Sequence, residues 1–371
     1  MKTKTRHIVG ATILSRLVVI ISFCLLAIST CVAQEFANIE YLCPDWGPAM
    51  TWSGKTNESP KFSETEEEVY FIKQIGSFTR KKMKMRDPLS GRDTADEGHG
   101  ISIWLCKMKP DGSEKTEIKE LWRNPNYPID TQGQSCWMDV NAKTRKIALA
   151  IAYAGNDITG LWTMNLDGSD LKRIIKPEQT EKHLQAINHP SWTPDGQWIV
   201  FEEELRGTNP NQYRIVKCDS RGGKVVRLTN GPQDRQPCVS PEGTQVTFIH
   251  WINWGSLLWL MDLDGSNQRA RLDPDGKLHG GTYPSWSSDG KEVLLECRII
   301  DVASGKVILE RCPMLQGRQG TYGWPHWGKL GILGLTEVGG ILLTDVELKE
   351  AKWIGSSKLA QCSGLKDSCR W

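Results

Sequence analysis

The sequence predicts an all-β fold, in which a single β-propeller is built from four-stranded blades. Three observations carry this prediction. A pattern of Pro, a large apolar residue two positions later, an acidic residue followed by Gly, and then a β-rich run recurs, most clearly at residues 190–201, 237–248 and 284–295. A second pattern, which ends in Asp-Gly-Ser, occurs at residues 161–169 and 258–266. Successive copies begin roughly 40–50 residues apart, which is the period of a propeller blade.

Each repeat predicts two β-hairpins in succession. The Pro begins a strand, where its missing N–H does little harm, and the Gly supplies the positive φ of a tight turn. The second pattern supplies the third strand, another turn and the fourth strand. Weaker copies begin at Pro60, Ser135 and Pro325, which gives six copies. A seventh blade is predicted if the segments at 34–58, 74–100 or 122–127 supply strands that the pattern misses.

Residues 1–33 are predicted to be a secretory signal peptide. Basic residues precede an apolar run at residues 17–28, and small residues at 31–33 form a cleavage pattern. An uncleaved membrane anchor is the alternative, but the apolar run is short for a bilayer span. We therefore expect an exported chain that keeps no stable membrane span after cleavage.

The remaining chain is predicted to form three parts. These are a lead-in at 34–58, the propeller at 59–357 and a Cys-containing tail at 358–371. We expect the lead-in to add an edge strand to the last blade, because propellers commonly close their ring by mixing both termini. The six blades are expected at residues 59–123, 124–180, 181–230, 231–277, 278–317 and 318–357.

The charge balance argues against nucleic acid as a partner. The full chain carries 46 Lys and Arg against 44 Asp and Glu, and cleavage of the signal peptide removes basic residues only. A nucleic-acid-binding domain is expected to show a basic excess or a basic stripe. We therefore expect no nucleic-acid partner.

The cysteines are spaced too widely for a haem or zinc motif. No Cys-x-x-Cys occurs, so neither covalent haem attachment nor a zinc knuckle is predicted. Disulfides are the expectation for an exported chain. Cys297 and Cys312 flank Ser304-Gly305, and a hairpin turn there would place the two Cys opposite each other. Cys362 and Cys369 are a second candidate pair in the tail.

No catalytic residue, cofactor site or metal site is predicted in this chain. The nucleophile elbow of hydrolases, the helical zinc-protease motif, the dinucleotide fingerprint and the phosphate loop are all absent from the sequence. Residues 262–267 resemble the start of a calcium loop but lack its distal Glu. The same Asp-Gly recurs along the chain, so a hairpin turn is the favoured interpretation.

The first candidate binding site is one mouth of the propeller channel. Residues just before the motif Pro of each blade converge there, although they lie far apart in sequence. They could bind a small anion or a partner side chain, and a polar channel lined for solvation is the alternative. A hydrolase or lyase is least favoured, because no carboxylate is predicted beside the His and the Arg to orient a base. The candidate residues are His189, Arg235, Tyr283 and Trp324.

The second candidate site is an aromatic loop within the blade at 231–277. Exposed aromatic side chains at a loop tip are energetically poor unless something covers them. We favour a protruding partner contact, with packing against a neighbouring blade as the alternative. The loop residues are His250, Trp251, Ile252, Asn253 and Trp254.

The repeat signatures at 190–201, 284–295, 161–168 and 258–265 resemble the TolB-type propeller repeat. The resemblance covers most of residues 59–350. It implies a domain that binds other proteins, such as a periplasmic scaffold or adaptor, and it says nothing about a reaction.

More narrowly, the exported, haem-motif-free chain with its Trp-rich loop at 250–254 resembles hydrazine synthase β subunits of anaerobic ammonium-oxidising bacteria. This resemblance implies α and γ partner subunits that carry c-type haems and condense nitric oxide with ammonium into hydrazine. The chain would then belong to an oxidoreductase complex without a catalytic site or cofactor of its own. It also implies seven blades, a place in the anammoxosome lumen, and a loop that influences transfer of an intermediate between partner active sites.

Overall fold

The computed structural model describes most of the chain after position 48. The contacts divide the chain into two compact units, residues 1–50 with 81–93, and residues 51–80 with 94–371. The propeller belongs to the second unit. The predicted signal peptide at 1–33 and the tail at 358–371 lie outside the described residues. The described residues are 49–63, 65–81, 97–124, 135–152, 158–176, 184–205, 212–252, 255–311, 314–315, 318–319, 323–335, 341–349 and 351–355.

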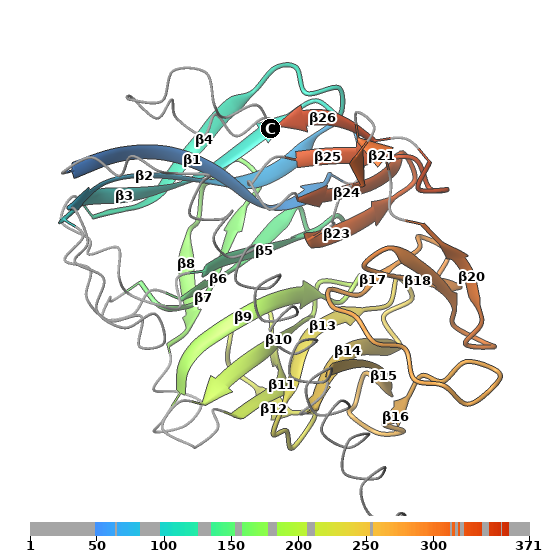
Figure 1. Cartoon of the computed structure of the whole chain (residues 1–371). Helices are drawn as coiled ribbons and strands as arrows, with labels where there is room; N and C mark the ends of the chain where they lie inside the picture. The colour runs from blue at the N-terminus through green and yellow to red at the C-terminus, as the bar shows by residue number, and fades with distance from the viewer. Residues whose placement is uncertain are drawn as a thin grey trace, which may run out of the picture. The chain divides into compact units, whose positions relative to one another are not determined.

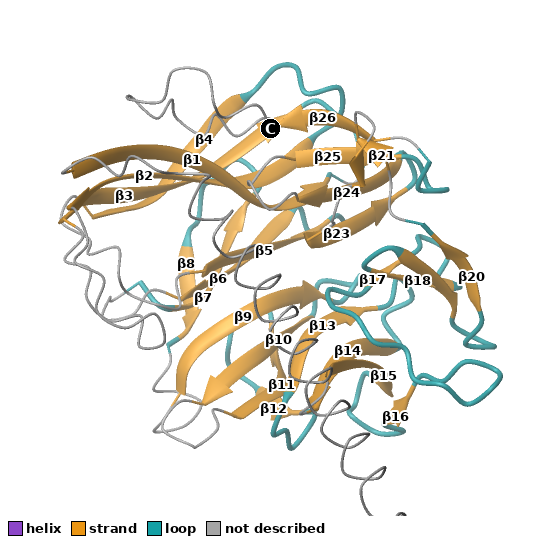
Figure 2. Cartoon of the chain, in the orientation of Figure 1, coloured by secondary structure: helices purple, strands orange, loops and turns teal. Residues whose placement is uncertain are grey.

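The described chain folds into six four-stranded antiparallel sheets, each built from consecutive strands (Figures 1 and 2). We number these sheets as blades 1 to 6 in chain order. Blade 1 contains β1 (Ala49–Phe62), β2 (Val69–Lys81), β3 (Glu97–Met108) and β4 (Thr116–Asn124). Blade 2 contains β5 (Ser135–Asn141), β6 (Lys146–Ala152), β7 (Gly160–Asn165) and β8 (Lys172–Ile175). Blade 3 contains β9 (Leu184–Trp192), β10 (Trp198–Leu205), β11 (Gln212–Asp219) and β12 (Val225–Arg227).

The last three blades follow the same order. Blade 4 contains β13 (Asp234–Val239), β14 (Gln245–Ile252), β15 (Gly255–Asp262) and β16 (Arg269–Ala270). Blade 5 contains β17 (Ser285–Trp286), β18 (Glu292–Leu295), β19 (Arg298–Asp301) and β20 (Val307–Glu310). A small hairpin of β21 (Met314–Leu315) and β22 (Arg318–Gln319) precedes blade 6, which contains β23 (Gly323–Gly328), β24 (Gly331–Leu335), β25 (Ile341–Thr344) and β26 (Ala351–Gly355).

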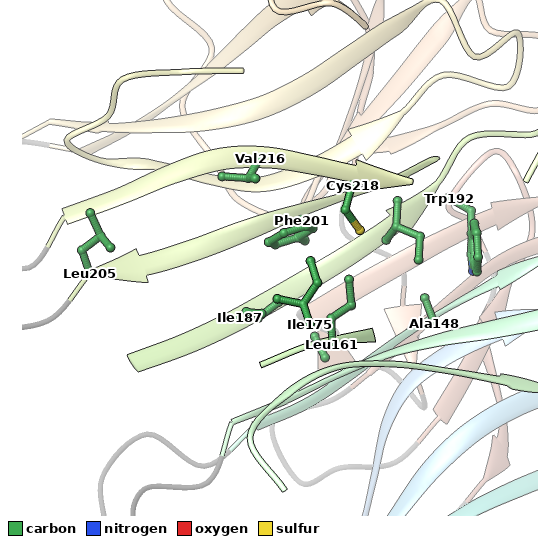
Figure 3. Packing of buried hydrophobic residues seen from close by; sticks show 11 residues of the cluster. Ala148, Leu161, Ile175, Ile187, Trp192, Phe201, Leu205, Val216 and Cys218 are labelled. Atoms are coloured by element: carbon green, nitrogen blue, oxygen red, sulfur yellow. The ribbon is translucent and has the colours of Figure 1, made fainter. Parts of the chain in front are cut away.

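Six apolar clusters join the six blades into a closed ring. Each cluster takes side chains from two neighbouring sheets. Figure 3 shows the cluster between blades 2 and 3, in which Leu161 and Ile175 pack against Ile187, Phe201 and Val216. Burial of each such side chain contributes about 1.5–3 kcal/mol, so every seam between blades has its own hydrophobic core.

The seam between the last blade and the first closes the ring. Phe62 and Phe71 of blade 1 pack with Leu333 and Leu343 of blade 6. The carboxylate of Glu66 also accepts two backbone N–H groups of blade 6, from Lys329 at 2.6 Å and Leu330 at 2.7 Å. Side chains and backbone groups of two separate sheets therefore form this seam.

Turn glycines let neighbouring blades approach closely. Gly222, between β11 and β12, has φ +77°, and a Cβ added there would lie 2.1 Å from the carbonyl oxygen of Ile174 in blade 2. Gly305, between β19 and β20, has φ +75°, and a Cβ added there would lie 1.8 Å from the carbonyl oxygen of Leu272. These turn glycines therefore end hairpins and also fit against the preceding blade.

The predicted six-bladed, all-β propeller is confirmed. The predicted ranges of blades 2 to 6 each contain one sheet, whereas the sheet of blade 1 begins at Ala49, before the predicted start at 59, and ends at Asn124. The described part of the lead-in, 49–58, belongs to β1 of blade 1 and not, as the sequence predicts, to an edge strand of blade 6. Of the segment at 74–100, residues 74–81 belong to β2 and residues 97–100 to β3, and Trp122 lies in β4. These segments enlarge blade 1, and the described residues contain no seventh four-stranded sheet.

Two further features of the described residues bear on the predictions. Cys297 is disulfide-bonded, and Ser304-Gly305 forms the turn of its hairpin, in which the Gly305 N–H donates to the Asp301 carbonyl at 2.8 Å. Cys312, Cys362 and Cys369 lie outside the described residues. Over the ranges that the structure covers, no helix is long and apolar enough to cross a membrane.

Candidate functional site

A central cavity of about 400 Å³ runs between the first strands of the blades. Every blade contributes lining residues from its first strand or the turn that follows. His189, Gln236 and Tyr283 line the end at which these strands begin, which we call the channel mouth. Asn141 and Pro194 line the opposite end, near the first Asp-Gly turns, which we call the turn end.

An unusual backbone conformation sets the side chains of the channel mouth. The residue before the motif Pro has a positive φ in several blades: 49° at His189, 54° at Gln236 and 55° at Tyr283. Such values are rare for residues other than Gly and cluster at functional sites. In blades 3 and 4 the register between the first two strands also shifts here, so each strand carries an irregularity at this point.

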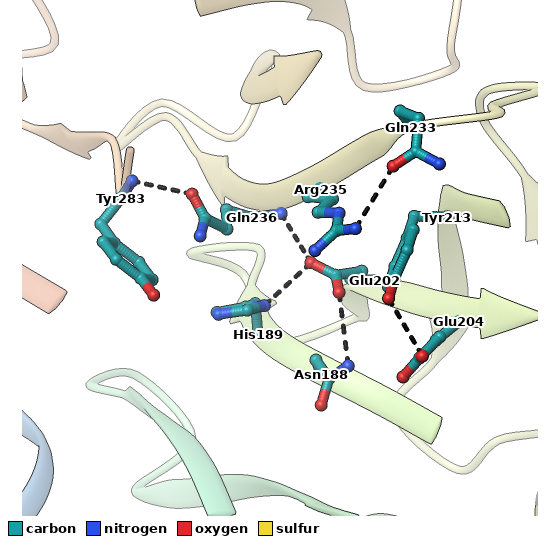
Figure 4. A network of polar contacts seen from close by, with 9 residues as sticks. All are labelled: Asn188, His189, Glu202, Glu204, Tyr213, Gln233, Arg235, Gln236 and Tyr283. Carbon is teal, nitrogen blue, oxygen red and sulfur yellow. Dashed lines mark hydrogen bonds and ion pairs between the residues drawn. The ribbon is translucent and has the colours of Figure 1, made fainter. Parts of the chain in front are cut away.

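A hydrogen-bond network around Glu202 of β10 joins three blades at the channel mouth (Figure 4). This carboxylate is only 2% exposed. It accepts hydrogen bonds from the Asn188 amide at 3.3 Å and from the Gln236 N–H of blade 4 at 3.0 Å, and it lies 2.9 Å from Nδ1 of His189. The Gln236 side chain then accepts the Tyr283 N–H of blade 5 at 2.9 Å. The mouth is thus held in one arrangement by hydrogen bonds between blades.

The surroundings of Glu202 favour its charged form. Burial alone would raise the pKa of this carboxyl group, but the neighbouring His189, the Gln236 N–H and Arg235 outweigh burial and lower the pKa below its ordinary value. The expectation that no carboxylate lies beside the mouth His was therefore wrong. The outer nitrogen of His189, Nε2, is buried and points toward Tyr283, and it has no hydrogen-bond partner among the described residues (Figure 4).

Three aromatic rings border the cavity at the channel mouth. The centroid of the Trp137 ring of blade 2 lies 4.1 Å from that of the His189 ring. The centroid of the Tyr283 ring of blade 5 lies 5.9 Å from that of His189. Trp137 and Tyr283 are 6.4 Å apart. These distances are typical of aromatic packing, so residues of blades 2, 3 and 5 form one aromatic edge.

Arg235 occupies a different place from the one predicted. Gln236, rather than Arg235, lines the cavity. The Arg235 guanidinium lies 3.3 Å from the Tyr213 ring and 5.3 Å from the Trp251 ring, and it donates to the Gln233 side chain at 3.2 Å. Cation–π contacts of this kind stabilise by about 0.5–2 kcal/mol. Arg235 therefore packs between Tyr213 of blade 3 and Trp251 of the predicted aromatic loop.

The aromatic loop is shorter than predicted. His250, Trp251 and Ile252 belong to β14, and Ile252 pairs with Gly255 across the hairpin. The His250 ring lies 2.7 Å from the Asp234 carboxylate, and Ile252 is 42% exposed. Asn253 and Trp254 lie outside the described residues. Trp324 lies in β23, but its side chain is not described.

Glu202 was not among the predicted site residues, although the sequence carries a signal for it. Glu202, Glu203 and Glu204 are consecutive in a strand where blade 4 has Ile249, His250 and Trp251 at the corresponding positions. All three carboxylates are buried, and two of them are bound to β11, Glu203 to the Arg214 guanidinium and Glu204 to the Tyr213 hydroxyl. Three acidic residues in a core strand predict buried partners, because an unpaired buried charge is costly.

Comparison with known proteins supports a TolB-like β-propeller. The chain is 28% identical to the Tol-Pal system protein TolB of Francisella tularensis over a region covering 38% of this chain and 42% of the relative. An uncharacterized protein of Agrobacterium fabrum is also 28% identical, over 38% of this chain and 49% of the relative. The chain thus spans less than half the length of the curated relatives it matches.

Other comparisons give the fold alone or nothing. The propeller resembles a chain in the crystal structure of a nidogen/laminin complex, with a TM-score of 0.50, 10% identity and coverage of 83% of this chain and 92% of that one. No family model matches the chain. None of these relatives is a hydrazine synthase subunit, so that narrower resemblance gains no support from them.

Proposed function

We propose that this protein is an exported, TolB-like scaffold that binds a segment of a partner protein at the channel mouth. The observation that carries the proposal is the Glu202 network, which fixes polar and aromatic groups from neighbouring blades around the opening of a cavity. The similarity to TolB and the predicted signal peptide support the same role and a periplasmic location.

The chemistry of the mouth suits a peptide segment with an apolar or aromatic side chain. Rigid aromatic residues contribute much of the binding energy in protein interfaces. Trp137, His189 and Tyr283 border the cavity at fixed distances from one another. Because the hydrogen bonds already order these groups, little conformational entropy is lost when a partner binds.

The test begins with the full chain purified from its own source. Native mass spectrometry identifies its partner, and titration of that partner then compares variants. We expect Tyr283→Ala to weaken binding at least about 10-fold, as at interface hot spots. Arg173→Ala is the matched control, because Arg173 also contacts an aromatic ring, Trp162, but does not line the cavity. Equal affinities for Tyr283→Ala and the wild type would refute docking at the mouth.

The same purification separates this proposal from the hydrazine synthase prediction. A redox-complex subunit would co-purify with haem-bearing α and γ subunits, and the complex would show a Soret absorbance band. The isolated chain would show none, because it lacks a Cys-x-x-Cys-His motif. Co-purification with a haem-free partner supports the scaffold. Haem-bearing partners would instead restore the sequence prediction, including the proposed influence of residues 250–254 on transfer of an intermediate.

A further inference from the structure

One side chain from each blade forms a ring around the channel wall, below the mouth. In blades 1, 3, 4, 5 and 6 it follows the motif Pro. Blade 2 lacks this Pro, but Asp139 occupies the position that Ser191 occupies in blade 3. The residue after each of them makes the equivalent strand pairing: Val140 pairs with Ile147, and Trp192 pairs with Ile199. All six side chains line the cavity. The wall ring consists of Lys61, Asp139, Ser191, Cys238, Ser285 and His326.

Most members of the wall ring accept a hydrogen bond from the next blade. The donor is the backbone N–H one position past the ring residue of that blade. Four such bonds are Trp192 N–H to Asp139 Oδ2 at 2.8 Å, Val239 N–H to Ser191 Oγ at 3.0 Å, Trp327 N–H to Ser285 Oγ at 3.1 Å, and Phe62 N–H to His326 Nδ1 at 3.1 Å. These bonds therefore use the acceptor atoms of the ring to join the blades.

Cys238 follows the same pattern, with the Trp286 N–H of the next blade. Lys61 is the exception, because an ammonium group has no acceptor. Its Nζ lies 3.4 Å from Oδ1 of Asp139, and its side chain is 20% exposed. Both oxygens of Asp139 then have a neighbouring donor, Lys61 at one and the Trp192 N–H at the other. The ammonium carries three N–H donors, and this single long contact leaves donors of Lys61 for the cavity.

Because the acceptor atoms are used between blades, N–H and O–H groups of the ring remain to donate to a ligand in the channel. Because Nδ1 of His326 accepts the Phe62 N–H, the neutral ring carries its proton on Nε2. Burial, and then the charge of Lys61, lower the pKa of His326 well below its ordinary value, so this imidazole stays neutral and donates. The Ser285 hydroxyl keeps a proton to donate once its oxygen has accepted, whereas the Ser191 hydroxyl is hydrogen-bonded to the Cys238 side chain.

The net charge of the cavity lining also favours an anion. The described lining includes two ammonium groups, Lys61 and Lys143, against one carboxylate, Asp139. Two positive charges minus one negative charge leave a net +1. A cavity of about 400 Å³ also holds several waters at about 30 Å³ each, so a small hydrated ion fits without displacing side chains.

We propose that the wall ring binds a small oxyanion in the channel, with Lys61 as its main contact and the Ser285 hydroxyl and His326 Nε2–H as further donors. The ligand class is a sulfate- or phosphate-like ion, or a small organic carboxylate with the same acceptor chemistry. This site lies deeper than the channel mouth and does not depend on partner docking.

The first test is isothermal titration of the full-length protein with sulfate, phosphate and acetate at constant ionic strength, with chloride as the background ion. We expect saturable one-site binding to the wild type, and at least a 10-fold loss of affinity in Lys61→Met. The preferred probe separates an inorganic oxyanion from a carboxylate. Lys61→Arg, which keeps the charge and the donors, is expected to restore binding.

Lys73→Met is the matched control. Lys73 lies in the same blade and is also paired with a carboxylate, that of Glu117, but it does not line the cavity. We expect this variant to bind like the wild type. Equal binding by Lys61→Met and Lys73→Met would overturn the proposal, as would the absence of saturable binding to the wild type.

A second measurement needs no variant and remains informative if Lys61→Met does not fold. Cys238 lines the cavity, whereas Cys218 is buried between blades 2 and 3. We expect saturating oxyanion to slow alkylation of Cys238 by iodoacetamide several-fold, read by peptide mass spectrometry, and to leave Cys218 unchanged. Equal slowing at both thiols, or at neither, contradicts the site. Tyr283→Ala is expected to retain oxyanion binding, so failure of this proposal is distinct from failure of the docking proposal.

Discussion

The two ends of the propeller channel are built by different kinds of interaction. At the turn end, the same local hydrogen bond recurs. The N–H of the turn Gly donates to the backbone carbonyl three positions earlier, at 2.8 Å for Gly196, 2.9 Å for Gly243 and 3.0 Å for Gly290. At the channel mouth, Glu202 contacts His189, 13 positions away, and Gln236, 34 positions away. The turn end is thus determined within each repeat, and the mouth only when blades come together.

This difference indicates that the turn end contributes to folding stability and the channel mouth to binding specificity. The turn end repeats because each hairpin needs the same turn, so its residues are interchangeable among blades. The mouth differs from blade to blade and contains groups that are costly to bury, such as the Glu202 carboxylate. Such costs are tolerated where the arrangement is used for binding, which is where we place partner docking.

The largest expected effect is at the mouth. Glu202→Ala removes the carboxylate that His189, Asn188 and the Gln236 N–H share. We expect the free energy of unfolding to fall by about 3–5 kcal/mol, because these buried groups lose their partner. Urea denaturation measures the change. Glu242→Ala, at an exposed position of the turn end, is the control and is expected to stay within about 0.5 kcal/mol of the wild type. Similar losses in both variants would erase the distinction between the two ends.

The next effect concerns a turn that packs against the neighbouring blade. Gly222→Ala is expected to cost about 2–4 kcal/mol, because it combines an unfavourable positive φ with a clash against the Ile174 backbone. Gly276 has φ +81°, and a Cβ added there meets no atom of the described chain within 4 Å. Gly276→Ala should therefore cost only about 1–2 kcal/mol. Equal midpoints in thermal unfolding would show that blade contact adds nothing.

A smaller effect depends on pH. The folded pKa of Glu202 is lowered from its ordinary value of 4.5, so the folded state binds this proton less readily than the unfolded state. The resulting stabilisation is fully present above pH 4.5 and is lost as the pH falls through the lowered pKa. Glu202→Gln lacks this contribution. We therefore expect the difference in urea midpoint between the wild type and Glu202→Gln to shrink below pH 4.5. A difference that stays constant from pH 7 to pH 3 would contradict this assignment.

The smallest effect is expected at an exposed ion pair of the turn end. Lys291 and Asp289 are separated by 3.4 Å, with side chains 77% and 56% exposed. Such pairs contribute about 0–1 kcal/mol, so Lys291→Ala should leave the thermal midpoint nearly unchanged. A large loss would mean that the turn end also depends on electrostatic interactions that differ among blades.

The sequence predicts the fold in detail because the information is local and repeated. Pro, the acidic-Gly turn and the β-rich run each act within a few residues, and six copies confirm one another. The same reasoning misplaced the lead-in: residues 49–58 extend the first strand of blade 1, and no turn residue there distinguishes that pairing from one in blade 6.

The site was predicted only in part. His189 and Tyr283, each directly before a motif Pro, both line the cavity. Arg235 lies two positions before Pro237, and Gln236, the residue directly before this Pro, lines the cavity in its place. The pairs of Glu202 with His189 and of Lys61 with Asp139 depend on contacts between strands or between blades, which repeat spacing does not specify.

The seam between blades 6 and 1 has a mechanical consequence. In the part of the chain that the structure describes, no sheet combines strands from both ends of the chain. A pulling force that separates Phe62 from His326, and Glu66 from Leu330, would therefore part the two sheets without breaking a strand ladder. We expect the molecule to yield first at this junction under load, with each blade still intact.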